Sequence, residues 1–164
     1  MISLTAVVCW SMPLFAQSTL VSDSFVEAVA LIESGGDTQV KGDAGKAAGR
    51  WQMHEAAWAD ITSYRLRKGW QVWSYDQAQD ATVARLYARD YLTMLENQLR
   101  NALGDQVTVE MIYAAYNMGF GNFRKREFLV ENSPTATRAA CSRVSQLLAS
   151  LEKSKTVPDL AKAD

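Results

Sequence analysis

The sequence predicts a single, mainly α domain that contains at most one small β-hairpin or glycine-rich loop. The chain has 164 residues and a mass of 18.2 kDa, which suits one domain with a sizeable hydrophobic core. Apolar residues recur at helical spacing along most of the chain, and no region is rich in alternating strand patterns. Five glycines between Gly35 and Arg50 interrupt the helical spacing, so we expect the loop or hairpin there.

The first predicted helix runs from Ser24 to Glu33. Ser24 and Glu27 have the spacing of a capping box, in which each side chain binds a backbone N–H group that the helix leaves free. Gly35 and Gly36 follow directly and favour termination, because glycine adopts the left-handed conformation that ends many helices.

The later helices are predicted from the same kinds of signal. Glycines close three of them, at Gly69, Gly104 and Gly119, and Ser133 with Pro134 opens the last one. The predicted ranges are 54–68, 76–103, 108–117 and 133–153. The longest carries one apolar stripe at helical spacing, made of Ala84, Ala88, Tyr91, Leu95, Leu99 and Ala102.

Charge and composition exclude several functions. The net charge is −1 and the pI is about 5.9, and the basic clusters at 65–68 and 124–126 are short, so solvated faces are indicated and nucleic acid is not an expected partner. His54 is the only histidine, which excludes a multi-histidine metal site, and we expect no metal and no cofactor. Cys141 lies among apolar helical residues, which indicates a buried thiol.

Glu33 is the first candidate for chemistry. Its spacing from Val26, Val29 and Ala30 places it on the apolar face of the first helix. Burial disfavours a charged carboxylate, and the negative end of a helix adds to this effect, so we expect a raised pKa. A carboxyl group that keeps its proton near neutral pH can serve as a general acid.

Three short motifs follow one another in the chain: Glu33-Ser34, then Gly49 with Gln52-Met53, then Ala115-Tyr116-Asn117 with Gly119. Their order and spacing resemble the lytic transglycosylases of the SLT type, within the lysozyme-like superfamily. That family has a Glu-Ser pair closing its first long helix, a Gly-Leu-Met-Gln-like block, and an Ala-Tyr-Asn-Ala-Gly block near the end of the domain. The resemblance covers about Ser24 to Val144 and implies a lysozyme-like fold.

The resemblance also implies roles for individual residues. Tyr116 is expected to reach the catalytic carboxyl with its hydroxyl, and Asn117 to meet a sugar acetamido group. Gln52 and Met53 are expected to shape the opposite wall, and Ser34 to belong to the substrate site. Trp51 is the aromatic residue that we expect to line the groove, because sugar rings pack well on aromatic faces.

Some positions depart from the family pattern. Arg50 and Trp51 replace a small apolar pair, a change that would reshape the floor of a sugar subsite or add a charged donor there. Ala136 and Ala140 stand where the family has Glu and Tyr, so any contact made by those two side chains is missing here.

The implied reaction is cleavage of the glycosidic bond between N-acetylmuramic acid and N-acetylglucosamine in peptidoglycan. Only one acid is placed by the motifs, whereas a hydrolase that works with two carboxylates needs a second acid across the bond. A transglycosylase needs no second acid, so we expect Glu33 to act first as acid and then as base, with a 1,6-anhydro product. Two alternatives stay open: a goose-type-like lysozyme in which Asp37 or Asp43 orients water, and a wall-binding module without activity.

The N-terminus predicts export. Residues 1–18 are uncharged with an apolar centre, as in a signal peptide, and their polar residues make an uncleaved membrane anchor the less favoured reading. We therefore expect a signal peptide over 1–18, a catalytic domain over 19–153 and a disordered tail over 154–164. The expected location is the bacterial periplasm or the exterior, with glycan strands as partner and a monomeric state. Wall turnover and the assembly of a secretion or envelope apparatus are the alternative contexts.

Overall fold

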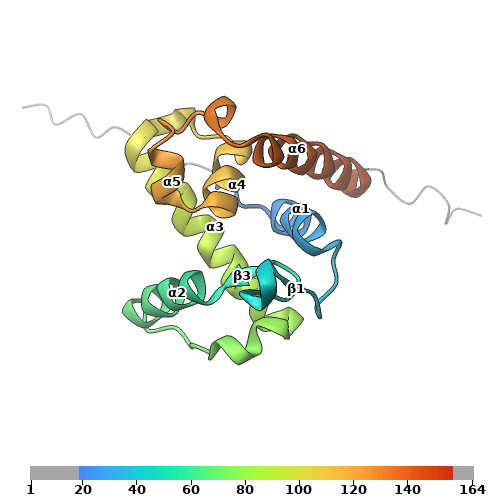
Figure 1. Ribbon diagram of the computed structural model, residues 1–164, viewed down its shortest axis with the longest axis vertical. Coiled ribbons are helices and arrows are strands. Elements are labelled where there is room, and N and C mark those ends of the chain that lie inside the picture. The colour runs from blue at the N-terminus through green and yellow to red at the C-terminus, as the bar shows by residue number, and fades with distance from the viewer. Residues whose placement is uncertain (1–18, 157–164) are drawn as a thin grey trace, which may run out of the picture.

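The computed structural model describes residues 19–156, so the predicted signal peptide and the end of the predicted tail lie outside the described residues. Six α-helices account for most of this range (Figure 1). They are α1 (Asp23–Ser34), α2 (Glu55–Arg67), α3 (Ala81–Leu103), α4 (Val109–Met118), α5 (Phe120–Arg124) and α6 (Thr135–Thr156). None of the helices in this part of the chain has the length and apolar character to span a membrane.

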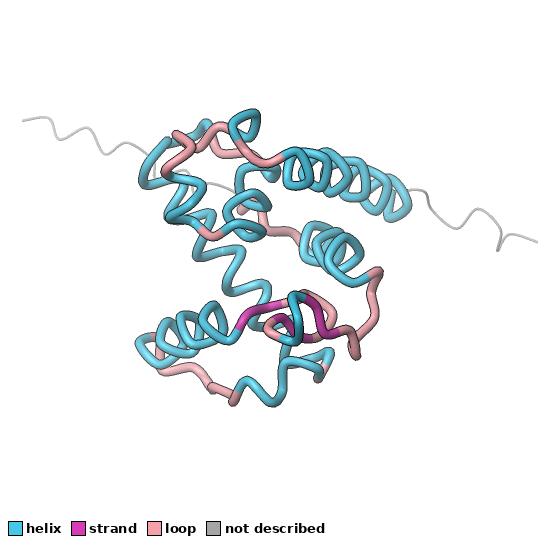
Figure 2. The backbone as a smooth tube through the Cα atoms, viewed as in Figure 1, coloured by secondary structure: helices cyan, strands magenta, loops and turns pink. Residues whose placement is uncertain are grey.

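A small antiparallel sheet lies between α1 and α2, where the glycines predicted a loop or hairpin. Its three strands, in the order β1-β2-β3, are β1 (Lys41–Gly42), β2 (Ala47–Ala48) and β3 (Met53–His54). Lys41 pairs with Ala48, and Ala47 pairs with His54. Figure 2 shows these strands in magenta, close to α2 and below α1, α4, α5 and α6.

The helix α3 connects the two parts of the molecule. In Figure 1, α1, α4, α5 and α6 lie above, α2 and the sheet lie below, and α3 runs through both levels. Above, α6 packs against α1 and α4; below, α3 packs against α2 and against the 3₁₀ helix η2 (Tyr75–Gln79). Shorter 3₁₀ helices are η1 (Asp43–Gly45), η3 (Gly104–Gln106) and η4 (Val130–Asn132).

Aromatic packing and one ion pair hold the lower part to α3. Trp58 on α2 stacks on Tyr87 of α3, with ring centroids 3.8 Å apart. Arg65 forms a largely buried ion pair with Asp90, and its Nε also donates to the carbonyl of Gln71 at 2.7 Å. Burial raises the pKa of Asp90, and the bonds to Arg65 counteract part of that effect.

A buried carboxylate on α3 fixes the start of the described chain. Glu96 is 2% exposed and accepts hydrogen bonds from the Thr19 hydroxyl at 2.7 Å and the Leu20 N–H at 3.0 Å. Arg100, one turn along α3, also binds it at 2.9 Å. Burial alone would raise the pKa of Glu96, but these hydrogen bonds outweigh burial and lower it.

The structure corrects two predicted helix starts. The N-cap of α1 is Ser22, whose hydroxyl accepts from the Phe25 N–H, while Ser24 is buried inside the first turn. The longest helix begins at Ala81 rather than Asp76, because Asp80 caps it by accepting from the backbone N–H groups of Thr82 and Val83.

The helix ends are closer to the predictions. Gly35 ends α1 in the left-handed conformation, with φ of 66°, and its N–H donates to the carbonyl of Leu31. The helix α6 continues to Thr156, so the first residues of the predicted tail are helical. The stripe on α3 is buried at Ala84, Ala88, Leu95 and Leu99 but partly open at Tyr91 and exposed at Ala102.

Candidate active site

Glu33 is the penultimate residue of α1. Its carboxyl is partly buried, and burial raises its pKa above the ordinary value. Hydrogen bonds from Tyr113 and Asn117 stabilise the charged form and counteract part of this effect. The raised pKa expected from the sequence is therefore present, and burial is its main cause.

Tyr113 on α4 is the residue whose hydroxyl reaches Glu33. It donates to Glu33 Oε1 at 2.9 Å, across 80 residues of sequence. The pKa of Tyr113 is strongly raised, first by burial and then by the neighbouring Glu33, so the hydroxyl stays protonated and remains a donor. Tyr113 thus holds one oxygen of the carboxyl.

Tyr116 lies one turn further along α4 and contacts a different group. Its hydroxyl donates to the carbonyl of Trp51, which precedes Gln52 in the sheet region. Its ring stacks on that of Tyr113 and lies 5.5 Å from the ring of Tyr91 on α3. The expected contact between the Tyr116 hydroxyl and Glu33 is therefore wrong. Tyr113 and Tyr116 share one face of α4, and helical spacing cannot tell which of the two reaches the acid.

Asn117 is oriented by α6. Its Oδ1 accepts from the Thr137 hydroxyl at 2.8 Å, which leaves the amide nitrogen to donate towards Glu33. Thr137 is 6% exposed and was not predicted as a site residue, although it lies within the range from Ser24 to Val144 that resembles the family.

The sheet supplies the opposite wall. Gln52 has a left-handed backbone with φ of 46°, and its side-chain amide donates to the carbonyls of Val40 at 2.9 Å and Gly49 at 2.7 Å. His54 and Asp43 face each other at 3.6 Å between Nε2 and Oδ2. These bonds fix Gln52 and leave the His54–Asp43 pair exposed to solvent.

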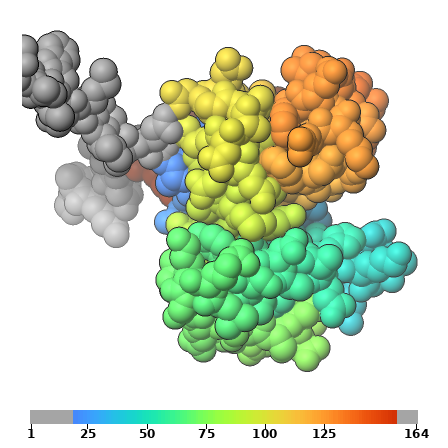
Figure 3. All heavy atoms as spheres, turned by 90° about the vertical axis from the view of Figure 1, so that its left-hand side faces the viewer, coloured from blue at the N-terminus to red at the C-terminus, as the bar shows by residue number. Residues whose placement is uncertain are grey.

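Two adjoining cavities form one groove. The smaller, about 210 Å³, contains Glu33, Asp43 and Ala47 among its lining residues, and the larger, about 350 Å³, contains Met53, Asp60 and Tyr91. Both are also lined by the same four residues, Gln52, His54, Tyr116 and Asn117. Figure 3 shows the hollow between the orange upper part and the cyan and green lower part.

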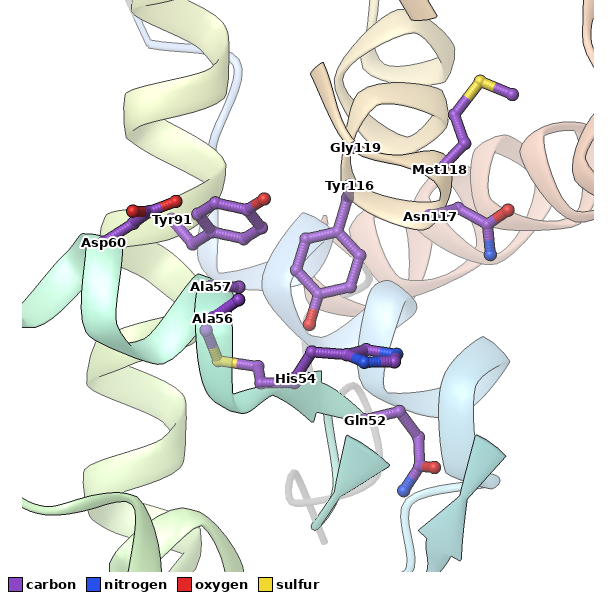
Figure 4. A pocket seen from close by; sticks show the side chains of 11 residues that line it. Gln52, His54, Ala56, Ala57, Asp60, Tyr91, Tyr116, Asn117, Met118 and Gly119 are labelled. Atoms are coloured by element: carbon purple, nitrogen blue, oxygen red, sulfur yellow. The ribbon is translucent and has the colours of Figure 1, made fainter. Parts of the chain in front are cut away.

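The close-up in Figure 4 shows how the walls face each other. Tyr116 projects from α4 between Tyr91 on one side and His54 on the other, and Asp60 lies beyond Tyr91. The walls of the groove thus contain aromatic rings, a histidine, amides and carboxylates. Within residues 19–156, no group of three or more His, Cys, Asp or Glu side chains has the geometry to hold a metal ion.

Residues 15–138 match the family described as the Transglycosylase SLT domain. The chain belongs to this family. The family implied by the three motifs, the SLT domain, is thereby confirmed. The mainly α, lysozyme-like fold class is confirmed as well.

A solved structure has the same fold as this SLT domain. It is the X-ray structure of an inactive mutant of the lytic transglycosylase Slt from Pseudomonas aeruginosa, with a TM-score of 0.66 and 18% sequence identity. The match covers 83% of this chain and 22% of the other, so the SLT domain spans about a fifth of that protein's length. No curated protein matches the chain.

The remaining predicted site residues of the SLT domain divide between groove and core. Gln52, Met53 and Asn117 line the groove. Trp51 does not line it: the ring is 1% exposed, and its Nε1 donates to the carbonyl of Val26 at 2.9 Å, so the expectation of a sugar platform there is wrong. The Ser34 hydroxyl donates to the carbonyl of Arg50 at 2.7 Å and accepts from the Gly36 N–H, which ties the end of α1 to the sheet.

Arg50 also points away from the groove of the SLT domain. It forms an ion pair with Glu27 on α1 and lies over the ring of Trp51. The departure at Arg50-Trp51 therefore changes the packing between α1 and the sheet, and neither side chain lines the two groove cavities. Of the positions that lack the family's Glu and Tyr, Ala136 is exposed and Ala140 is buried.

Proposed function

We propose that this SLT domain cleaves the bond between N-acetylmuramic acid and N-acetylglucosamine in peptidoglycan, with Glu33 as the catalytic acid and base. The observation that carries the proposal is a partly buried carboxyl with a raised pKa, held by Tyr113 at the wall of a groove. The P. aeruginosa structure supports it by analogy, because that protein is an inactive mutant in which glutamine replaces a glutamate.

The proposed reaction consumes no water. The protonated Glu33 gives its proton to the glycosidic oxygen as the bond from that oxygen to C1 of the muramoyl sugar breaks. The carbonyl oxygen of the acetamido group of the same sugar stabilises the positive charge at C1. The ionised Glu33 then takes the proton from the C6 hydroxyl as O6 bonds to C1, which restores the acid and leaves a 1,6-anhydro sugar.

The neighbours of Glu33 suit this cycle. Tyr113 binds Oε1, which leaves Oε2 to exchange the proton, and its bond to the charged form keeps the carboxylate in place between the two steps. Asn117, fixed by Thr137, presents an amide that would orient the acetamido group of the substrate. The aromatic rings of Tyr91 and Tyr116 would contact the sugars in the larger cavity.

Hydrolysis is the second candidate, and Asp43 is the residue that favours it. Asp43 lines the same cavity as Glu33, whereas Asp37 does not line it and instead caps a turn by accepting from the Gln39 N–H at 2.8 Å. The contact with His54 would keep Asp43 oriented if it were to position a water molecule. A wall-binding module without activity is the third candidate.

Product analysis separates these functions. Purified peptidoglycan is digested, and the soluble muropeptides are weighed by mass spectrometry, with the variant Glu33→Gln as control. A transglycosylase yields anhydro ends that are one water lighter than hydrolytic ends, and hydrolytic ends alone would refute the proposal in favour of the lysozyme. Sedimentation with the wall and no soluble product would indicate the binding module.

The location and assembly of the protein belong to the same proposal. Because the substrate is the cell wall, we place the activity outside the cytoplasm, in the periplasm or beyond, and we propose that the domain acts as a monomer on glycan strands.

A further inference from the structure

A third cavity adjoins the groove on the side of α5. It measures about 410 Å³ and is lined by Met118, Asn122, Lys125, Arg126 and Pro134. Met118 also lines the larger groove cavity, so the two cavities share this residue. This basic cavity, as we call it from here on, contains no carboxylate among its lining residues.

The positive charges of the basic cavity are available to a ligand. Within residues 19–156, no ion pair joins Lys125 or Arg126 to an acidic side chain, and both residues are exposed. Arg126 is held by its own bond to the loop, because its Nη1 donates to the carbonyl of Asn132 at 2.6 Å and the Asn132 amide donates back at 3.3 Å. Its other N–H groups remain for an acceptor.

The chain around the basic cavity is compact. After α5, Glu127 and Phe128 adopt left-handed backbone angles, which turn the chain back on itself. The Phe128 ring then packs against Phe120 and Phe123, with centroids 5.4 Å and 5.7 Å apart. Lys125 and Arg126 thus project from a turn anchored in the core, which lowers the entropy cost of binding.

We propose that the basic cavity binds the acidic stem peptide of peptidoglycan, an inference that rests on the proposed function. The stem peptide is attached to the muramoyl sugar itself, so a strand bound in the groove would bring its peptide close to the groove, and Met118 is the residue that the groove shares with the basic cavity. The free carboxylates of that peptide match the ammonium of Lys125 and the guanidinium of Arg126. The side chains of Met118 and Pro134 offer apolar contact to the alanyl methyl groups.

The test compares two substrates that differ only in the peptide. One is glycan strands with intact stems, and the other is the same strands after an amidase has removed the stems. We expect kcat/KM of the wild type to be higher on peptide-bearing strands, by about fivefold, the scale of a partly exposed charge-assisted contact. This preference should weaken as salt is added. Lys125→Glu should abolish the preference and leave the rate on bare strands unchanged, and Lys125→Arg should keep the preference.

A matched control is Lys155→Glu, which changes the net charge equally at the far end of α6 and should behave like the wild type. Equal losses on both substrates, or no loss on either, would overturn the inference. The inference would also fall if Lys125→Glu kept the preference but lost binding to vesicles rich in phosphatidylglycerol, because the charges would then face an anionic membrane.

Binding measurements separate this inference from the proposed function. Sedimentation of the Glu33→Gln variant with each kind of strand reports affinity without cleavage. If the wild type cleaves neither substrate, the proposed function fails, and the inference still stands or falls on whether peptide-bearing strands bind more tightly through Lys125.

Discussion

The raised pKa of Glu33, on which the proposed chemistry depends, also lowers the stability of the fold at neutral pH. Its folded-state pKa is raised, whereas in the unfolded chain the same carboxyl has an ordinary pKa. Between these two values the folded state binds more protons than the unfolded state, so stability falls as the pH rises through that window. Above the raised pKa, the ionised carboxylate destabilises the fold.

Replacing Glu33 with glutamine should therefore lower activity and raise stability at the same time. We expect the kcat of Glu33→Gln on peptidoglycan to be about 10²–10⁴-fold lower than that of the wild type, because this is the usual contribution of a general acid and base. At neutral pH its free energy of unfolding should exceed that of the wild type by roughly 0.5–2 kcal/mol, as for other stabilising substitutions. This gain in stability should disappear below about pH 4, where the Glu33 carboxyl is protonated in both the folded and the unfolded wild type. Denaturant unfolding at several pH values measures the gain. A variant that is less stable than the wild type at neutral pH would contradict this account.

The two tyrosines of the site should respond differently to loss of their hydroxyls. In Tyr113→Phe, the bond that stabilises charged Glu33 is gone, so the pKa of Glu33 should rise further and the basic limb of the kcat/KM profile should move to higher pH. Activity should also fall, by up to about 10²-fold, because the carboxyl is no longer positioned.

Tyr116→Phe is the matched control, since its hydroxyl donates to the Trp51 carbonyl instead. In this variant, the basic limb of the kcat/KM profile should lie at the same pH as in the wild type. A shift with Tyr116→Phe and none with Tyr113→Phe would reverse the assignment made from the hydrogen bonds.

At the scale of the elements, the sheet region packs closely against η2 at Gly49. Gly49 has φ of 73°, and a Cβ there would lie 2.0 Å from the carbonyl oxygen of Ala78. Because the carbonyl of Gly49 also accepts from the Gln52 amide, a displacement of this residue would move the wall of the groove. The glycine of the second motif is thus required by a close approach of two backbones.

Two alanine substitutions in this region should differ in effect. Gly49→Ala combines a left-handed backbone with a clash against backbone atoms, so it should lower the free energy of unfolding by about 3 kcal/mol or more. It should also remove most of the activity. Gly45→Ala, with φ of 87° and no atom within 4 Å of the added Cβ, should cost only about 1 kcal/mol. Thermal unfolding of both variants measures the difference, and equal losses would mean that the clash relaxes.

The helix boundaries show which local signals are sufficient. Gly35, Gly104 and Gly119 end helices as predicted, because left-handed or unusual backbone angles at these points suit glycine. The starts were less accurate: Ser22 and Ser24 are both good caps, and the choice between them depends on Ser24 being buried in the core. The separation of η2 from α3 likewise depends on Asp80, a cap inside a run of residues that otherwise suits a helix.

For the whole molecule, the sequence predicted the fold class and the raised pKa of Glu33, but not the side chains that bind its carboxyl. Glu33 and Tyr113 are 80 residues apart, and their contact depends on how α4 packs beside α1, which no local pattern contains. The position of the Trp51 side chain also depends on tertiary packing. A tryptophan beside a groove motif could face the groove or the core, and the structure places it in the core because α1 offers the Val26 carbonyl to its ring nitrogen.

The carboxylate of Glu96 holds Thr19 and Leu20 beside α3 and so fixes the direction of the chain at these two residues. Since Thr19 and Leu20 are both bonded to it, these two residues are held at the flank of α3. This attachment is also sensitive to acid: it is complete above the ordinary carboxyl pKa and is lost as the pH falls through the lowered pKa of Glu96. A second protein joined directly to Thr19 would therefore keep a defined direction at neutral pH and gain freedom in acid.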